Sequence, residues 1–387
     1  MFLIQKEFLV PLLRKNYFSM GQYLNSLSKV EKKINEKSIK KILFISGKNS
    51  FNKTGAKEIF KKVSKDKEKF LYIKKSNFPN LQELEKIIKF KESLKPDLIV
   101  AIGGGCSIDY AKIASVFNAE KNFKKKIINS DYFLKNKIRV LAIPTTAGSG
   151  AEVTSSAVIY IDKIKYSVEG SELIPNYYSL IPNFLLSSNL KIDSSSGFDA
   201  ISQSIESIFS KKSTQQSILF AKKGLKILFK NYNDFLKKKN IYNSYKMALG
   251  ANLSGKAINI SRTTAPHALS YPLTAHFNIP HGHAVSLTLN KFLKFNYRHL
   301  NKSNCNFDLN KRFQLLFNLT KSKNLFELDL FLNTLKKKAS LEQNFSKLGV
   351  NIETGINRIV SGLNDQRLAN NPIKVSKKDI KYIIENF

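Results

Sequence analysis

Residues 96–112 read PDLIVAIGGGCSIDYAK, a short apolar run that ends in three glycines and continues into a helix-like segment. Glycine lets the backbone turn tightly or approach a ligand closely, because no Cβ stands in the way. The free N–H groups and the dipole of a helix start favour negative charge, so this segment predicts a phosphate-binding turn. The alternative is a tight strand-to-helix turn without a ligand, since the spacing is not G-x-G-x-x-G.

The order of strand, turn and helix repeats on both sides of this segment. Residues 41–45 (KILFI) end at Ser46-Gly47, and residues 139–143 (RVLAI) end at 144–146 (PTT). Residues 80–94 have a helical pattern between two such runs. This order predicts a parallel sheet covered by helices, with ligands at the carboxyl ends of its strands.

Short apolar runs typical of β-strands become rare after about residue 190. Four later segments have helical periodicity: 194–210, 214–231, 242–260 and 326–348. We therefore predict an α/β nucleotide-binding domain in residues 1–187 and an all-helical, metal-binding and substrate-binding domain in residues 188–387. The cleft between two domains is where a ligand site is expected.

The composition narrows the class of protein. The 387 residues include 64 Lys+Arg and 29 Asp+Glu, a formal net charge of +35. Because the lysines are scattered along the chain, we expect an anionic small substrate, not nucleic acid. The N-terminus lacks the features of a signal peptide, and no run approaches the ~20 apolar residues of a membrane helix. The sequence thus predicts a cytoplasmic enzyme without a membrane partner.

The histidines are concentrated in one place. Five occur in the chain, four of them fall between His267 and His283, and both His267 and His281 follow a proline. Imidazole is the commonest metal ligand in proteins, so the cluster predicts a metal site. Chance enrichment in a proline-rich loop region is the alternative.

A second set of metal-binding candidates lies on the predicted helix that contains residues 197–206. Asp199, Gln203 and Glu206 fall on one stripe, one turn apart, so they can point at one place. One carboxylate and two imidazoles suit Zn or Fe(II), and the Gln203 carbonyl is a candidate for a weaker fourth ligand. The alternative is an ordinary solvated helix face.

Taken together, these segments resemble the iron-containing (group III) alcohol dehydrogenases along nearly the whole chain. The resemblance rests on the segments 103–109 (GGGCSID), 144–154 (PTTAGSGAEVT), 198–206 (FDAISQSIE), 267–281 and 370–372 (NNP). It implies a dehydroquinate synthase-like fold and the interconversion of alcohols and aldehydes with NADH or NADPH and a divalent metal, Fe(II) or Zn.

The resemblance also implies roles for individual residues. The metal ligands of the family are one Asp and three His; Asp199, His267 and His281 match three of them, and Gln203 stands where the family has its first His. Many members carry a further His where this chain has Tyr271. The residues implied or predicted to bind the cofactor are Gly47, Lys48, Gly103, Gly104, Gly105, Cys106, Asp109, Thr145, Thr146 and Ser149. Gly47 with Lys48, in place of an acidic residue, favours acceptance of NADPH.

The amino-acid sequence of residues 257–272 is most similar to that of the phosphonoacetaldehyde reductase branch of the family. The branch implies reduction of a small anionic aldehyde, phosphonoacetaldehyde, to 2-hydroxyethylphosphonate. We expect Arg262, Thr263 and Lys165 to bind the substrate, although Arg262 could instead be a surface residue at a helix end. Tyr271 and His283 are the candidate proton donors.

Three other functions stay open. The chain could be a general alcohol dehydrogenase, or a sugar-acid 8-oxidase or dehydroquinate synthase-like lyase of the same fold. It could also be a non-catalytic protein that binds anions or nucleic acid. The sequence leaves the oligomeric state open, with a homodimer one option.

Overall fold

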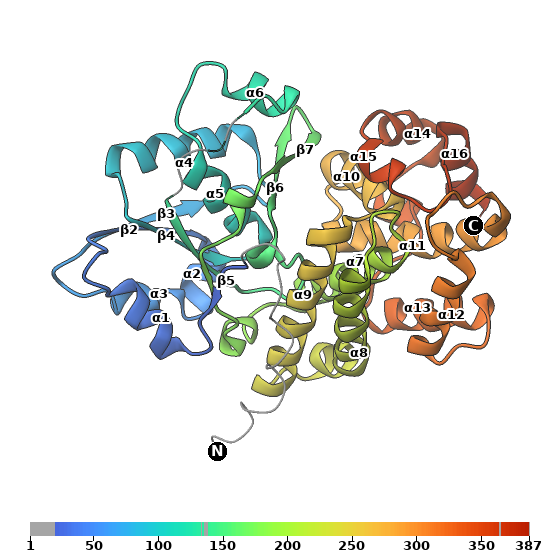
Figure 1. Ribbon diagram of the computed structural model, residues 1–387, viewed down its shortest axis with the longest axis horizontal. Coiled ribbons are helices and arrows are strands. Elements are labelled where there is room, and N and C mark those ends of the chain that lie inside the picture. Colours follow the sequence, from blue (N-terminus) through green and yellow to red (C-terminus); the bar gives the residue numbers. More distant parts are fainter. Residues whose placement is uncertain (1–19, 133, 135–137, 364, 387) are drawn as a thin grey trace.

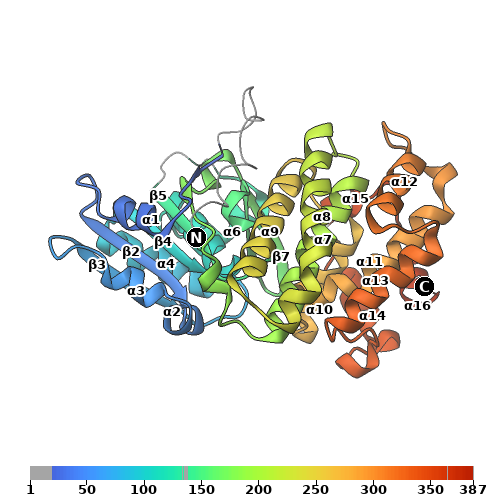
Figure 2. The same ribbon diagram turned by 90° about the horizontal axis from the view of Figure 1, so that it is seen from below.

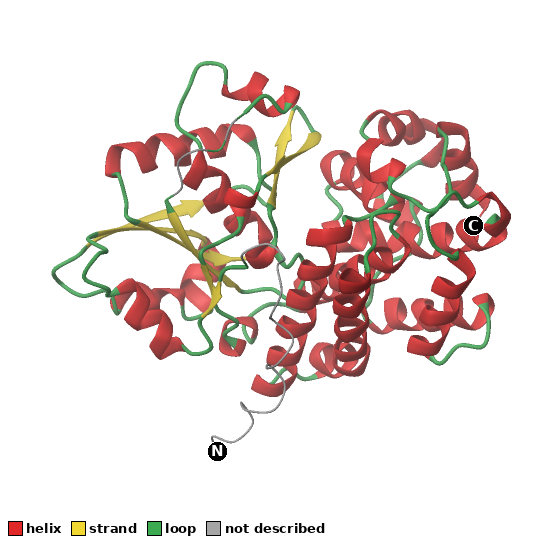
Figure 3. Cartoon of the chain, in the orientation of Figure 1, coloured by secondary structure: helices red, strands yellow, loops and turns green. Residues whose placement is uncertain are grey.

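The computed structural model describes residues 20–132, 134, 138–363 and 365–386, so the N-terminal stretch considered for a signal peptide lies outside the described residues. Figure 1 shows two halves side by side, and Figure 3 shows that the strands of the described residues all belong to the first half. The last of these strands ends at Tyr178, and the helical half begins with α7 at Leu190.

A six-stranded parallel sheet forms the centre of the first half. Its strand order is β1-β8-β5-β4-β2-β3. The strands are β1 (Gln22–Tyr23), β2 (Lys41–Gly47), β3 (Glu68–Lys74), β4 (Leu98–Gly103), β5 (Arg139–Pro144) and β8 (Tyr177–Tyr178). β2, β4 and β5 confirm the three predicted strands. They are neighbours in the sheet, so the three turns that follow them lie along one edge.

Helices cover both faces of this sheet because the central strands are apolar on both faces. Leu43, Ile99 and Val140 pack into the core beneath α4 (Leu81–Leu94) and α5 (Gly105–Val116). Their neighbours in the same strands pack into a second core beneath α1 (Leu27–Ile34) and α3 (Ala56–Lys61). Two short helices, α2 (Lys48–Lys53) and α6 (Phe123–Asn129), complete this half.

An antiparallel hairpin stands between the two halves. It consists of β6 (Ser156–Ile161) and β7 (Ile164–Glu169). In Figure 1 it rises beside the helical half, and β7 packs against α10. The hairpin therefore carries residues of the first half to the helices of the second.

The second half is a bundle of helices, seen from another side in Figure 2. They are α7 (Leu190–Phe209), α8 (Gln215–Lys237), α9 (Ile241–Ser261), α10 (Ala265–Phe277), α11 (His281–Arg298), α12 (Leu309–Thr320), α13 (Leu325–Lys338), α14 (Ile352–Ser361), α15 (Asp365–Ala369) and α16 (Lys377–Asn386). α7, α8 and α9 confirm three predicted helices.

One expectation and one alternative interpretation for this half were wrong. The helix expected over residues 326–348 ends at Lys338, because the chain turns at Ser340 with a φ of 52°. The histidine-rich segment is not a loop region. It forms α10 and the start of α11, with Pro266 in the first turn of α10, where proline lacks only an N–H that has no helical partner. No helix among the described residues has the length and apolar character to span a membrane.

Candidate active site

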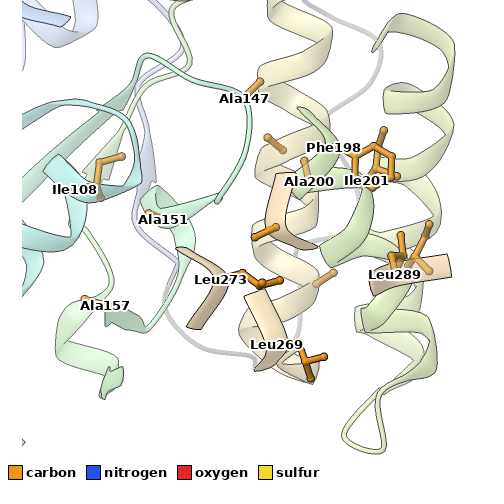
Figure 4. Close-up of a cluster of buried hydrophobic side chains, with 14 of the residues drawn as sticks. Ile108, Ala147, Ala151, Ala157, Phe198, Ala200, Ile201, Leu269, Leu273 and Leu289 are labelled. Atoms are coloured by element: carbon orange, nitrogen blue, oxygen red, sulfur yellow. The ribbon is translucent and has the colours of Figure 1, made fainter. Parts of the chain in front are cut away.

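Three helices bring the candidate metal ligands together. Asp199 lies in the middle of α7, His267 in the first turn of α10, and His281 begins α11. The segments around Asp199 and His267 are fixed by apolar packing; Figure 4 shows Phe198, Ala200 and Leu269 in the buried cluster between these helices. Asp199, Gln203 and Glu206 are themselves buried, so the solvated-face alternative is wrong.

Gly282 lets α11 approach α7 at this point. A Cβ on Gly282 would lie 1.9 Å from the carbonyl oxygen of Ser195 and 2.7 Å from the Cβ of Asp199. Any larger residue would push the start of α11, and with it His281, away from Asp199. The close approach therefore depends on glycine.

The three side chains form a compact cluster of possible ligands. One ligand atom from each of Asp199, His267 and His281 lies within 4.8 Å of the others. Oδ1 of Asp199 is 3.3 Å from Nε2 of His267 and 3.9 Å from Nε2 of His281. Oδ1 of Asp199 and Nε2 of His267 are buried without a hydrogen-bond partner among the described residues. Buried polar atoms without partners are costly, and a divalent cation between them would satisfy both.

Further polar groups orient the two imidazoles. Glu206 accepts a hydrogen bond from Nδ1 of His267, and its other oxygen accepts from the backbone N–H (2.8 Å) and hydroxyl (2.9 Å) of Thr264. Nδ1 of His281 lies 3.3 Å from the hydroxyl of Ser270. In both rings Nε2 therefore faces Asp199. A carboxylate behind a histidine ligand fixes the ring and its tautomer, and it raises the basicity of the ligand.

The electrostatics of the cluster have opposite effects on its two histidines. Burial alone would lower the pKa of His267, but Glu206 and Asp199 outweigh burial and raise it to about 10. Burial, with the charge of Lys165, lowers the pKa of His281 to about 3. Burial would raise the pKa of Asp199, yet His267 and His281 keep it below its usual value. Asp199 is therefore an anion, and His281 has a free lone pair.

Gln203 belongs to the cluster by position, but its carbonyl oxygen is turned away. Its amide nitrogen donates to Oδ2 of Asp199 (3.0 Å), and its carbonyl oxygen accepts from the hydroxyl of Ser254 (3.1 Å). In this arrangement Gln203 orients Asp199 instead of offering an oxygen ligand. The sequence pointed to the residue but not to this orientation, because Ser254 comes from α9 and is distant in the chain.

Tyr271 and Lys165 lie next to the cluster. The ring of Tyr271 stacks on that of His281, with centroids 5.8 Å apart and planes at 19°. Nζ of Lys165, from β7, lies 3.5 Å from the centroid of the Tyr271 ring. Burial alone would raise the pKa of Tyr271, but the charges of Lys165, Arg367 and His267 lower it to about 8. Two predicted residues, one from each half, thus meet beside the candidate ligands.

Two of the other predicted residues, His283 and Arg262, contact groups outside the ligand cluster. Nε2 of His283 lies 2.7 Å from the backbone carbonyl of Glu342, and His283 is not part of the ligand cluster. The guanidinium of Arg262 pairs with Glu169 at 3.0 Å, and Arg367 pairs with the other oxygen of the same carboxylate at 3.1 Å. Arg262 is therefore not a simple cap of its helix. Arg367 carried no motif signal in the sequence.

The predicted cofactor residues lie along the carboxyl edge of the sheet. Gly104 precedes α5, and a Cβ there would lie 3.3 Å from Oγ1 of Thr146, while a Cβ on Gly105 would lie 2.7 Å from Oγ of Ser149. The loop after β5 thus packs directly on the glycine turn after β4. Close packing of the two loops is therefore one reason why glycine is needed at these positions. The same contacts bring backbone N–H groups and hydroxyls together, as a phosphate-binding site requires.

Other predicted cofactor residues surround this turn. Thr145 lies 3.2 Å from Ser50, hydroxyl to hydroxyl, while Gly47 ends β2 and Lys48 begins α2. Cys106 and Asp109 follow in α5; burial raises the pKa of Cys106 to about 12 and that of Asp109 to about 6. Cys106 is therefore a neutral thiol and not a nucleophile.

The two halves match two sequence models of one family. Residues 20–182 match the description "Iron-containing alcohol dehydrogenase", and residues 194–387 match "Fe-containing alcohol dehydrogenase family, C-terminal". The chain belongs to the iron-containing alcohol dehydrogenase family. It is therefore an oxidoreductase of the α/β-plus-helical fold, as the sequence predicted, and its candidate ligand cluster lies within residues 194–387.

Several members of this family are similar to the chain. It is 27% identical to 4-hydroxybutyrate dehydrogenase of Clostridium kluyveri over 310 residues, 78% of this chain and 81% of that protein. It is 31% identical to phosphonoacetaldehyde reductase of Streptomyces viridochromogenes over 216 residues, 53% of this chain and 54% of that protein, so this likeness covers about half of each.

A solved structure extends the likeness of the fold to nearly the whole chain. This structure is sulfoacetaldehyde reductase from Bifidobacterium kashiwanohense in complex with NAD+. It matches 97% of this chain and 100% of its own with a TM-score of 0.81, at 20% identity. At this identity the likeness shows the fold alone.

Proposed function

We propose that this protein reduces a small aldehyde that carries an anionic group, with phosphonoacetaldehyde as the leading candidate and 2-hydroxyethylphosphonate as its product. The family is one of alcohol and aldehyde oxidoreductases, and the anionic substrate is the part that goes beyond it. The two curated relatives described above are named for anionic compounds, a carboxylate and a phosphonate. A positively charged substrate site would suit either the carboxylate or the phosphonate.

The distribution of charge beside the ligand cluster is the observation that carries this proposal. Arg262 and Arg367 both pair with the carboxylate of Glu169, at the end of β7. Lys165, also from β7, places a further cation over the ring of Tyr271, where β7 meets α10. An anionic group on the substrate would be attracted to these cations, whereas a neutral aldehyde would not.

The residues present fit a divalent metal ion, which Asp199, His267 and His281 would hold. Such an ion supplies Lewis-acid polarisation of the carbonyl oxygen. Glu206 keeps the ring of His267 in place, and Gln203 does the same for the carboxylate of Asp199. These contacts hold the ligand atoms in position before substrate arrives.

A reduced nicotinamide cofactor would supply the hydride for the carbonyl carbon. The residues that would hold it are those of the turns after β4 and β5, Gly103, Gly104, Gly105, Thr145, Thr146 and Ser149, together with Cys106 and Asp109 of α5. Tyr271 is the candidate donor of the proton that completes the alcohol, because it stacks on His281 and contacts Lys165. Thr263 supports it through a hydrogen bond to the Tyr271 side chain.

A substrate comparison tests the proposal. Oxidation of NADPH and NADH should be followed with phosphonoacetaldehyde, succinic semialdehyde and propionaldehyde, which carry a phosphonate, a carboxylate and no charge. We expect kcat/KM to be highest for phosphonoacetaldehyde and lowest for propionaldehyde. Added salt should reduce the rate with the anions more than the rate with propionaldehyde, because screening acts over about 8–10 Å at moderate salt.

Two results would change the proposal. A preference for propionaldehyde would mean that the protein is a general alcohol dehydrogenase. A preference for succinic semialdehyde over phosphonoacetaldehyde would keep the anionic class and replace the phosphonate by a carboxylate.

A further inference from the structure

One face of α9 lies against the loop that continues from the cofactor turn after β5. The loop comprises residues 150–155 and contains the short 3-10 helix η1 (Ala151–Val153). Figures 1 and 2 show α9 on the side of the helical half that faces the sheet. Asn252, Gly255 and Asn259 follow one another at helical spacing, so they lie on one face of α9. Each of the three contacts the loop, and these contacts therefore join the two halves.

The two asparagines hold the loop by hydrogen bonds. Oδ1 of Asn259 accepts from the backbone N–H (2.7 Å) and from the hydroxyl (2.8 Å) of Ser155. Nδ2 of Asn252 donates to the carboxylate of Glu152 over 2.9 Å. Glu152 and Ser155 are both buried, so loss of either asparagine would take a partner away from a buried polar group.

Between the two asparagines, the backbones of the loop and the helix are themselves in contact. A Cβ on Gly255 would lie 2.7 Å from both Cα and the carbonyl oxygen of Gly150. A Cβ on Gly150, whose φ is 61°, would lie 2.5 Å from Cα of Gly255. Any side chain at this contact would push the loop and α9 apart, so glycine on both sides fixes their distance.

The loop is fixed separately within the first half. The buried ammonium group of Lys112, on α5, donates to the carbonyl oxygens of Ala151 (3.0 Å) and Ser156 (2.6 Å) and to Oγ1 of Thr154 (2.9 Å). The loop also follows directly on residues 145–149 of the cofactor turn. The loop, α5 and the cofactor turns therefore form one unit, and the contacts of α9 act on that unit as a whole.

The neighbouring face of α9 contacts the helix that carries Asp199. The hydroxyl of Ser254 lies 2.9 Å from the carbonyl oxygen of Ala200 and 3.1 Å from Oε1 of Gln203. Gln203 in turn holds the carboxylate of Asp199. Because Ser254 directly precedes Gly255, adjacent residues of α9 contact the candidate ligand cluster on one side and the cofactor loop on the other.

We propose that Asn252, Gly255 and Asn259 are positioning residues for hydride transfer, because they fix the cofactor turns relative to the candidate ligand cluster. This inference rests on the hydride transfer of the proposed function, but not on the identity of the aldehyde. The cofactor turns belong to the first half and the candidate ligands to the second, so the alignment of the two halves sets the distance between the reactants. Misplacement by about 1 Å can cost about 100-fold in rate.

The test changes the acceptor atom of Asn259. Asn259→Leu removes the acceptor and keeps a side chain of similar size, whereas Asn259→Asp keeps an acceptor oxygen. The matched control is Asn231→Leu, a buried asparagine whose amide donates to the carbonyl oxygen of Ile227 within α8. The dissociation constants of NADPH and NADH are measured by nicotinamide fluorescence, and the metal content by metal analysis. The rate of hydride transfer is measured in a single turnover, with the cofactor and aldehyde that wild-type enzyme uses best.

We expect Asn259→Leu to slow hydride transfer by about 10-fold or more, because the alignment of the halves is loosened. Its cofactor dissociation constants and metal content should match those of wild type, since each half keeps its own binding residues. Asn259→Asp should have the wild-type rate, because its oxygen still accepts from Ser155. Asn231→Leu should lower the Tm and leave the rate per metal-loaded protein unchanged.

A second variant covers a folding failure of Asn259→Leu. Gly255→Ala removes no hydrogen bond, but its Cβ would push α9 away from Gly150. We expect the same pattern, with slower hydride transfer and unchanged affinity for the cofactor.

Different results overturn different parts. A wild-type rate in Asn259→Leu or in Gly255→Ala would show that these contacts do not align the reactants. A loss seen only as weaker cofactor binding would make the α9 face a support of the cofactor turn alone. A slow Asn259→Asp would mean that the acceptor oxygen is not what matters. Absence of hydride transfer in wild-type enzyme with all three aldehydes would overturn the proposed function itself, and this inference with it.

Discussion

The amide nitrogen of Gln203 donates a hydrogen bond to Oδ2 of Asp199 over 3.0 Å, one helical turn away on α7. The other oxygen of Asp199, Oδ1, is the buried atom that faces the two histidines. Gln203 thus holds the carboxylate with one oxygen directed at the cluster. Gln203, which the resemblance matches to a histidine of the family, thus contacts Asp199 through its amide nitrogen.

Gln203→Ala should weaken metal binding without abolishing it. Loss of a group that orients a ligand typically costs about 10–100-fold in metal affinity. Competition with a chelator, followed by metal analysis, measures the affinity directly. Gln215→Ala, an exposed residue at the start of α8, is the control and should behave as wild type. A complete loss of metal in Gln203→Ala would instead make Gln203 a ligand.

His267→Ala should remove both the metal and the turnover. The ring provides a buried Nε2 atom that has no hydrogen-bond partner among the described residues, and alanine offers no ligand atom in its place. His276→Ala, on the same helix but outside the cluster, should retain the metal content of wild type. Full activity of a metal-free His267→Ala preparation would contradict the metal site.

Gly47→Asp should weaken the binding of NADPH much more than the binding of NADH. A Cβ on Gly47 would lie 3.7 Å from Cε of Lys74, an ordinary contact, so aspartate fits and brings a negative charge to Lys74. That charge would repel a 2′-phosphate at the end of β2. The KM values for both cofactors measure the effect, with the exposed Lys75→Met as a control of similar position. Equal changes in the two KM values would place the 2′-phosphate elsewhere.

Lys336→Met should stabilise the protein at neutral and lower pH. Burial, only partly offset by Asp329, lowers the pKa of Lys336 from 10.5 to about 7. Between these two values the unfolded chain binds more protons than the folded one, so stability rises with pH from about 7 to about 10.5. Below that window the charged lysine costs on the order of a few kcal/mol.

The gain in Tm for Lys336→Met over wild type should therefore be largest near pH 6 and should shrink as the pH approaches 10. The exposed neighbour Lys337→Met should show neither the gain nor its pH dependence. A variant that is less stable than wild type at pH 6 would mean that the ammonium group of Lys336 is well solvated or paired.

The sequence by itself determined the architecture and pointed to the three candidate ligands that the fold brings together. The apolar runs that become β2, β4 and β5, and the helical periodicity of α7, α8 and α9, follow from local patterns of burial that each segment carries alone. The histidine cluster and the α7 stripe were visible for the same reason, since each lies within one short segment.

Tertiary structure decided how those segments meet. The orientation of Gln203 depends on Ser254 of α9, and the position of His283 depends on the carbonyl of Glu342, so neither could be read from its own helix. The ion pair between Arg367 and Glu169 likewise forms between α15, which packs on α10, and the end of the hairpin strand β7. Contacts between segments distant in the chain leave no periodic signal in the sequence, so only the tertiary structure shows them.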